Sequence, residues 1–479
     1  MGPWSRTLTS IVIAAVGMWA GVSAVLKTSF ASKERPVSVI GPLLIQNESE
    51  WNHFKDLLHT AKKAGVDSVS TDVWMGIVQA DSPDTFNWTY YERLSKTIRE
   101  AGLKWVPILS THACGGNVGD SVNIPLPKWL WTKGEHFISE GGNANLDYVS
   151  YWDTPKVLPY YKRFYSEFSR HFGSEASNIP EVIISLGPSG EIHYPSYHSH
   201  DRNLSLAGYP NRGAMQASSE GAKKSFREGM LAKYGSLAGI NRAWNTSVQS
   251  LDEVSPPLHF KETQALFDTH LDSQYAQDLF DWYRETVIQH MKQMLGMTGE
   301  VFNKGEMKNA AIGIKIPGVH WRMDTRAAEL TTGLLSLNEK AEWNDVRKGL
   351  GYNKIFETLA EFSSKKKVHV YYTAGATPNG NKNSLAASRA QDLTEAISTL
   401  AKKYNLSAGI ENALAADVTD TSRIKIIENL IKKEKFGSIS LLRIEDVMNS
   451  RNMVKTIQKI NRLPPRFSSS RCVIRHIAP

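Results

Sequence analysis

The sequence predicts an α/β protein, a (β/α)8 barrel (TIM barrel) with long loops after strands three, four and five. The first reason is that short β-prone runs alternate with longer helical runs from residue 35 onwards, which is the pattern of a parallel barrel. The second is that the three longest irregular segments each follow the C-terminal end of a strand. A chain of 479 residues is long for one ordinary domain, but a single large barrel with insertions accommodates it.

Eight β-prone runs are expected to form the strands of this barrel. They are residues 37–45, 66–74, 104–111, 181–187, 310–316, 368–373, 407–411 and 438–444. Between them, a 3.6-residue apolar period predicts helices, and the first two of these end in a glycine; they are residues 50–65, 89–102, 273–295 and 388–404. The segments expected to be irregular leave from the face that carries the active site of such barrels; they are residues 112–155, 188–270 and 317–345.

The formal net charge is +8, and short basic runs occur at residues 365–367 and 432–435. Both runs are expected in amphipathic helices, so solvated helix faces are the favoured interpretation. A nucleic-acid patch is the alternative, but no aromatic residues interleave the charges, and no nucleic acid is expected as a partner. The two cysteines, Cys114 and Cys472, predict neither a disulfide framework nor a cysteine-based metal site. Cys114 is expected to be a small packed side chain.

The N-terminal residues 1–31 differ from the rest of the chain. They contain one early arginine, an apolar run from Ile11 to about Leu26, and then small residues suited to signal peptidase. We interpret them as an export signal, which predicts a secreted or periplasmic protein. An uncleaved membrane anchor is the alternative, although the apolar run is short for a full span. The rest is expected to form one barrel, residues 35–465, followed by a tail, residues 466–479.

Polar or ionisable residues stand at the C-terminal ends of most predicted strands. Each could be a buried polar group whose hydrogen bonds are satisfied within the protein. Together, with tryptophan and tyrosine beside them, they indicate a site for a polyhydroxylated ligand. In chain order these residues are Asp72, Glu191, Lys315, Thr373, Glu411, Asn412 and Arg443, and Lys315 is soon followed by His320 and Trp321.

Glu191 and Glu411 both emerge from strand ends, and their pairing points to glycoside hydrolysis, which needs one acidic and one basic carboxyl group. Glu191 lies close in sequence to Tyr194 and Tyr197, and an aromatic surround would raise its pKa and keep it protonated. Both tyrosines are also expected to line the ligand path. Glu411 is expected within reach of Lys315, which would keep it ionised. If the reaction inverts the anomeric centre, the two carboxyl groups should lie roughly 6.5–9.5 Å apart.

Four segments, "HACGGNVGD", "GPSGEIHYPSY", "KIPGVHW" and "GIENALA", resemble motifs of the β-amylases, glycoside hydrolase family fourteen. The resemblance extends over about residues 37–460 and is closest to bacterial members. It implies a barrel that releases β-maltose, with inversion, from the non-reducing ends of α-1,4-glucans or maltooligosaccharides, without a cofactor. It also implies that Glu191 is the general acid, that Glu411 is the general base, and that Asp120 lies in a lid loop. The implied sugar-binding residues are Asp72, His112, Lys315, His320, Trp321, Thr373, Asn412, Ala413 and Arg443.

The chain also departs from the family pattern. After the second predicted strand it has Met75 and Gln79, where the family usually has a tryptophan and a glutamate. That glutamate helps to hold calcium in some bacterial members, so no metal site is expected. His193 stands where the family has arginine, and "TAGATPNG" follows the sixth predicted strand, which predicts a looser loop after Thr373. A monomer without a starch-binding module is expected.

These departures leave two alternatives beside the hydrolysis of α-1,4-glucans. The first is a non-catalytic or weakly active glucan binder or sensor built on the same barrel. The second is a related barrel that acts on another sugar polymer.

Overall fold

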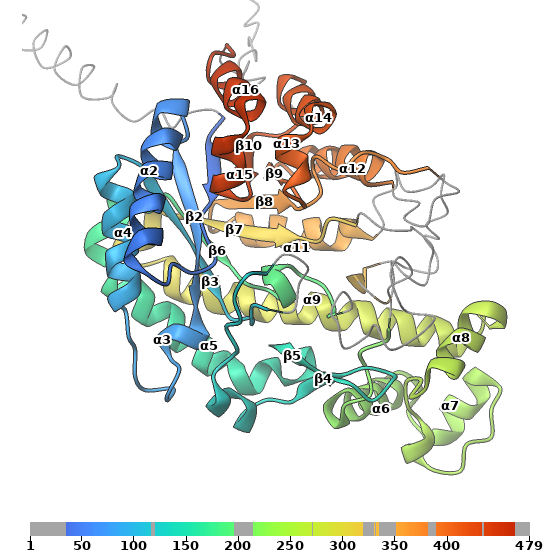
Figure 1. The fold of residues 1–479 in the computed structure, drawn as a ribbon. Coiled ribbons are helices and arrows are strands. Elements are labelled where there is room, and N and C mark those ends of the chain that lie inside the picture. Colours follow the sequence, from blue (N-terminus) through green and yellow to red (C-terminus); the bar gives the residue numbers. More distant parts are fainter. Residues whose placement is uncertain are drawn as a thin grey trace, which may run out of the picture. The chain divides into compact units, whose positions relative to one another are not determined.

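The computed structural model describes residues 35–115, 120–195, 214–270, 272–319, 330, 332–334, 351–381, 389–433 and 435–464. Its centre is a closed barrel of eight parallel strands, in the order β1-β10-β9-β8-β7-β6-β3-β2 (Figure 1). All eight predicted strands are confirmed, several of them shorter than predicted. Their bounds are β1 Val37–Ile40, β2 Ser68–Trp74, β3 Lys104–Ser110, β6 Glu181–Ile184, β7 Ala311–Ile316, β8 Val368–Tyr372, β9 Ser407–Glu411 and β10 Ser438–Leu441.

Helices connect the strands and cover the outside of the barrel (Figure 1). All four predicted helices are present, and Gly65 ends the first of them with a left-handed φ of 92°, which a residue with a side chain adopts at a cost. The bounds are α2 Glu48–Ala64, α3 Met75–Val78, α4 Thr89–Glu100, α5 Thr154–His171, α6 Glu220–Tyr234, α7 Leu237–Trp244, α8 Phe260–Thr269, α9 Gln274–Phe302, α11 Tyr352–Ser363, α12 Ala390–Lys403, α13 Ala416–Thr419, α14 Thr421–Lys432, α15 Ile444–Asn449 and α16 Arg451–Asn461.

The largest part of the core lies between the strands and the surrounding helices. Trp105 of β3 is fully buried, and its ring contacts Phe168 of α5 and Phe172 directly after it. Its indole nitrogen donates to the Thr71 hydroxyl of β2 at 2.8 Å, so its one polar atom is satisfied. Burial of a large aromatic side chain stabilises the fold by about 2–3 kcal/mol. These contacts hold the N-terminal end of β3 against α5.

Two of the segments expected to be irregular contain regular structure, so that prediction was wrong. Residues 112–155 include an antiparallel pair, β4 His136–Ile138 and β5 Ala144–Val149. Residues 188–270 include helices α6, α7 and α8. β4 and β5 are only 3 and 6 residues long, and α6 and α7 bury few side chains, so the apolar pattern of these elements is weak in the sequence. Only part of the third segment, residues 317–345, falls within the described residues.

The basic run at residues 365–367 was wrongly predicted to lie in a helix, although Lys365 and Lys367 are exposed as expected. It lies in the turn between α11 and β8. The Lys366 ammonium is buried and donates to the carbonyls of Phe302 and Lys308, both at 2.7 Å. A long basic side chain can therefore cap backbone carbonyls instead of facing water. In the second run, Lys432 ends α14 and Lys433 is exposed after it, as expected for a solvated helix end.

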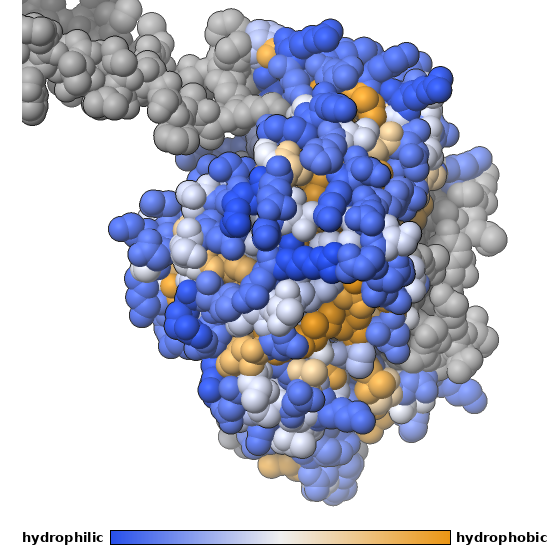
Figure 2. All heavy atoms as spheres, turned by 60° about the vertical axis from the view of Figure 1, so that its left-hand side comes forward, coloured by the Kyte–Doolittle hydropathy of each residue, from blue (hydrophilic) through white to orange (hydrophobic). Residues whose placement is uncertain are grey.

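The predicted export signal, residues 1–31, and the predicted tail, residues 466–479, lie outside the described residues. The compact barrel unit comprises Pro36–Pro464. Among the described residues, no helix combines the length and the apolar character needed to cross a bilayer. Figure 2 shows one face of the molecule, on which hydrophilic residues predominate and an apolar area lies near the centre.

Asp278 of α9 attaches helices α6 and α7 to α9. Its buried carboxylate accepts hydrogen bonds from four side chains at 2.6–2.9 Å, which are Lys233, Tyr234, Trp244 and Gln274. Three of these donors lie in or beside α6 and α7. One carboxylate therefore fixes two helices on the surface of α9.

We predict that Asp278→Ala lowers the free energy of unfolding by about 2–4 kcal/mol, because it removes four hydrogen bonds to a buried carboxylate, two of them from the half-buried Tyr234 and Trp244. Urea unfolding followed by circular dichroism measures this loss. Asp252→Ala is the matched control, since Asp252 also pairs with a basic residue, Arg227, but its side chain is 90% exposed. The control should leave the unfolding midpoint nearly unchanged. Equal losses in the two variants would contradict the anchoring role of Asp278.

Candidate active site

The predicted site residues lie at the C-terminal ends of the strands. Asp72 is in β2, Lys315 is in β7, and Glu411 is the last residue of β9. Thr373 follows β8 directly, and Arg443 follows β10 by two residues. Charge interactions link Asp72 with Lys315, Arg443 and Asp120, so residues far apart in the sequence form one site. His320 and Trp321, also predicted for this site, lie outside the described residues.

Glu191 is delivered to the site by a sharp turn after β6. The one-turn 3-10 helix Pro188–Gly190 follows Gly187, and Gly190 has a φ of 79°. A Cβ atom on Gly187 would lie 2.3 Å from the Glu191 carbonyl oxygen, so only glycine fits there. Glu191 then rejoins the barrel through a parallel bridge to Lys315. The predicted abrupt end of the strand is confirmed.

Burial governs the protonation of Glu191, whose side chain is 16% exposed. Desolvation raises the pKa of Glu191 to about 8 from its usual 4.5. A hydrogen bond with the Thr373 hydroxyl opposes the rise, the charge of Glu411 adds to it, and the Lys315 ammonium opposes it. Because the raised pKa lies above neutral pH, Glu191 is a carboxylic acid that can donate a proton.

Glu411 has a different environment, although it is also buried. Its Oε1 lies 2.9 Å from the Lys315 ammonium, and the two side chains are 5% and 9% exposed. This ion pair favours the negative charge of the carboxylate. Glu411 Oε2 has no hydrogen-bond partner among the described residues. That oxygen can therefore accept a proton from a water molecule at the site.

The tyrosines predicted to surround Glu191 have other positions. Tyr194 was expected to line the ligand path, but it is fully buried and stacks on Tyr283 with ring centres 3.8 Å apart. Its hydroxyl donates to the Tyr283 carbonyl at 2.9 Å, so the prediction that it lines the path was wrong. Tyr197 lies outside the described residues. Tyr372 of β8 lies close enough to Glu191 to feel its charge. Burial is the main cause that raises the pKa of the Tyr372 phenol, and the charge of Glu191 adds to the rise.

Two serines hold predicted ligand-binding residues. The Ser110 hydroxyl donates to Asp72 Oδ1 at 2.7 Å, and burial raises the pKa of Asp72. His112 Nδ1 lies 2.8 Å from the Ser185 hydroxyl, and the His112 ring packs edge-on against Trp74. The prediction missed both serines. The pattern that predicted the other site residues, polar residues at the ends of apolar strands, could also have identified these serines.

Asp120 begins the described part of the chain after the glycine-rich loop, whose residues 116–119 lie outside the described residues. Its Oδ2 accepts a hydrogen bond from the backbone nitrogen of Gly115 at 2.8 Å. Asp120 thus ties together the two ends of the predicted lid. Cys114 beside it is buried, and desolvation raises the pKa of its thiol to about 12, in agreement with a packed side chain.

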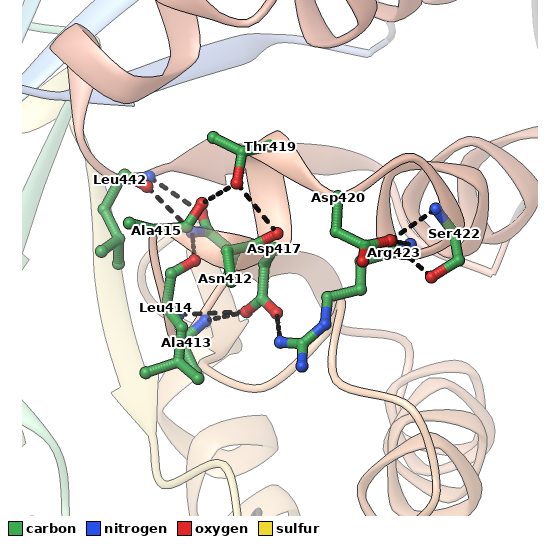
Figure 3. A network of polar contacts seen from close by, with 11 residues as sticks. Asn412, Ala413, Leu414, Ala415, Asp417, Thr419, Asp420, Ser422, Arg423 and Leu442 are labelled. Carbon is green, nitrogen blue, oxygen red and sulfur yellow. Dashed lines mark hydrogen bonds and ion pairs between the residues drawn. The ribbon is translucent and has the colours of Figure 1, made fainter.

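The loop after β9 is held by a polar network (Figure 3). The Asn412 amide donates to the carbonyls of Leu414 and Leu442 and accepts from the Leu442 nitrogen, all at 2.8–2.9 Å. Asp417 accepts from the backbone nitrogens of Ala413 and Leu414 at 3.0 Å. These bonds use both amide hydrogens of Asn412, so its contribution to ligand binding is limited to its oxygen. Asp417 was not predicted, and its role is to fix this loop.

The loop after β8 was expected to be loose, but its described part is packed. Ala374 and Ala376 are buried, and the Gly375 nitrogen donates to the Glu411 carbonyl at 3.0 Å. A Cβ atom on Gly375 would lie 2.5 Å from Ile410. The small side chains therefore allow this loop to approach β9 closely.

Sequence comparison relates the chain to known proteins. The family model described as glycosyl hydrolase family 14 matches residues 38–462. The chain is 35% identical over 429 residues to a β-amylase of Niallia circulans, covering 86% of this chain and 68% of that protein. It is 36% identical over 426 residues to a β-amylase of Cytobacillus firmus, covering 86% and 83% of the two chains.

Solved structures agree with the predicted fold. The catalytic domain of β-amylase from Paenibacillus polymyxa superposes with a TM-score of 0.76 at 31% identity, covering 91% of this chain and all of that chain. A β-galactosidase from Marinomonas ef1, at 12% identity and a TM-score of 0.54, covers 89% of this chain and 59% of its own and shares the fold alone. The resemblance seen in the motifs is confirmed, and the chain belongs to glycosyl hydrolase family 14.

Proposed function

We propose that this protein hydrolyses α-1,4-glucosidic bonds of starch-like glucans and maltodextrins at their non-reducing ends and releases β-maltose. The observation that carries the proposal is the pair of buried carboxyl groups in opposite environments. Glu191 has its pKa raised to about 8, whereas Glu411 is paired with Lys315. Glycosidases need this division into an acid and a base. The similarity to bacterial β-amylases supplies the substrate class.

In the proposed reaction, Glu191 donates its proton to the glycosidic oxygen as the bond to the anomeric carbon breaks. Glu411 Oε2 takes a proton from a water molecule that attacks the same carbon from the opposite face, which inverts its configuration. Lys315 stabilises the charge of Glu411 before this transfer. Asp72, His112 and Arg443 are proposed to bind sugar hydroxyls. The carboxyl separation of 6.5–9.5 Å stays a prediction.

We predict that Glu191→Gln and Glu411→Gln each lower the kcat on maltoheptaose by about 10³-fold or more, because each removes one of the two proton transfers. Chromatography quantifies the maltose, and NMR within the first minutes identifies its anomer. Glu181→Gln is the matched control, since Glu181 is also buried but begins β6 at the opposite end of the barrel. The control should retain turnover. A Glu411→Gln variant with full activity, or α-maltose as the first product, would contradict the assignment.

The raised pKa of Glu191 predicts that stability and activity both fall as pH rises, but over different pH ranges. The folded chain keeps this proton up to about pH 8, whereas the unfolded chain loses it near 4.5. The free energy of unfolding should therefore fall between these pH values, and kcat/KM should fall above about pH 8. Glu191→Gln should be more stable than the wild type above pH 8, by roughly 2–4 kcal/mol, and little different below pH 4.5. Urea unfolding at several pH values tests this; a stability gap independent of pH would refute it.

We also predict that Lys315→Met lowers kcat by about 10²-fold, because the variant loses the ion pair that holds the buried Glu411 carboxylate. Steady-state kinetics on maltoheptaose measure this loss. Lys366→Met is the control, because Lys366 is equally buried but binds only backbone carbonyls away from the site. It should lower stability and leave kcat nearly unchanged. If both variants lower kcat equally, the effect does not come from the ion pair.

A further inference from the structure

His193 is a buried histidine whose position is fixed beside Glu191. Its side chain is fully buried, and its backbone nitrogen donates to the Glu191 carbonyl at 3.1 Å. Its own carbonyl accepts a hydrogen bond from the Tyr151 hydroxyl at 2.5 Å. Tyr151 in turn stacks on His290 with ring centres 4.2 Å apart. The ring of His193 therefore cannot turn to solvent without disrupting this packing.

The hydrogen bond at Nδ1 determines the tautomer of His193. Nδ1 lies 2.6 Å from the Tyr194 carbonyl oxygen, which can only accept, so Nδ1 carries a hydrogen. In the neutral ring, Nε2 is then the acceptor. Nε2 lies 3.6 Å from Glu191 Oε2, just beyond hydrogen-bond distance, and the terminal torsion of Glu191 is soft enough to let this separation shorten. Catalytic hydrogen bonds are often long in a free enzyme and tighten in the complex.

We propose that His193 is a positioning residue for the general acid, whose Nε2 accepts the hydrogen of the Glu191 carboxyl group and holds the proton there until substrate binds. A hydrogen bond to the neutral form favours that form, and the same lone pair repels the carboxylate. Both effects keep Glu191 protonated. This inference rests on the proposed role of Glu191 as the acid.

The step requires no net proton transfer to or from His193. When substrate binds, rotation about the terminal bond of Glu191, a soft torsion, presents the protonated oxygen to the glycosidic oxygen. The proton passes from Glu191 to that oxygen. After product leaves, Glu411 gives to solvent the proton that it took from the attacking water, and Glu191 regains one from solvent. The ring is neutral before and after the reaction.

Other groups also act on Glu191, and the experiment must hold them constant. Thr373, Glu411 and Lys315 influence its protonation directly, and Tyr372 faces it from β8. His112 reaches the backbone of Gly190, the residue before Glu191. None of these residues is changed in the variants below, so a shift in the pH profile reports on His193.

The test compares kcat/KM as a function of pH for His193→Asn and His193→Gln. Asparagine can keep the bond to the Tyr194 carbonyl but has no atom near the position of Nε2. Its alkaline limb should move to lower pH by about 0.5–1 unit, the equivalent of one lost hydrogen bond. Glutamine can place an acceptor oxygen near Nε2 and should restore most of the wild-type limb.

His290→Asn is the structural control, because His290 is buried in the same aromatic cluster and donates to the Leu186 carbonyl. It should lower the melting temperature without moving the limb. An unchanged limb in His193→Asn, a limb moved to higher pH, or equal shifts in the asparagine and glutamine variants would each overturn the proposal.

A second readout separates this inference from the proposed function. In protein labelled with 13C at the glutamate carboxyl carbons, the Glu191 signal is identified by its loss in Glu191→Gln, and its titration is followed by NMR. Its midpoint should fall in His193→Asn whether or not the protein cleaves glucans. Absence of hydrolysis with a lowered midpoint would reject the function and keep the role of His193, whereas an unchanged midpoint would reject that role.

Discussion

Lys315 is the residue on which the geometry of the candidate site depends, because it holds both carboxyl-bearing segments. Its ammonium pairs with Glu411 at 2.9 Å. Its carbonyl accepts a hydrogen bond at 3.3 Å from the backbone nitrogen of Ile192, the residue directly after Glu191. One strand residue therefore sets the position of Glu191 through its backbone and the charge of Glu411 through its side chain. This arrangement is possible because β7 lies between the Glu191 segment and the strands that lead to Glu411.

Burial alone does not explain why Glu191 and Glu411 suit proton transfer. Glu181 is as buried as they are, but its Oε2 accepts from the Tyr371 hydroxyl at 3.0 Å and lies 2.9 Å from His369 Nδ1. It lies at the start of β6, where a barrel of this type has no binding face. Glu181 Oε1, like Glu411 Oε2, has no hydrogen-bond partner among the described residues, so an unused oxygen does not by itself mark a reactive carboxylate. Glu191 and Glu411 lie at the open end of the barrel, and this location distinguishes them from Glu181.

The sequence was sufficient to predict the strands and the charged residues at their ends, because both follow from local patterns. Strands buried on both faces are β-prone throughout, and a polar residue at their C-terminal end stands out. The positions of Tyr194, Lys366 and Asn412 depend on partners distant in the chain, namely Tyr283, Phe302 and Leu442. No local pattern identifies such partners. The expected ligand path along Tyr194 was wrong for this reason, since tyrosine suits a ligand path and a packed core equally well.

The departure from the family pattern after Thr373 has little effect on the position of Glu411. The loop there carries small side chains, but Glu411 is supported by other contacts. Its carbonyl accepts a hydrogen bond from the Gly375 nitrogen, its backbone pairs with that of Ser440 in β10, and its carboxylate pairs with Lys315. Backbone hydrogen bonds do not depend on side-chain identity, and the close approach of Gly375 to Ile410 requires a small residue. The altered loop therefore keeps the position of Glu411 and changes the side chains available to a ligand.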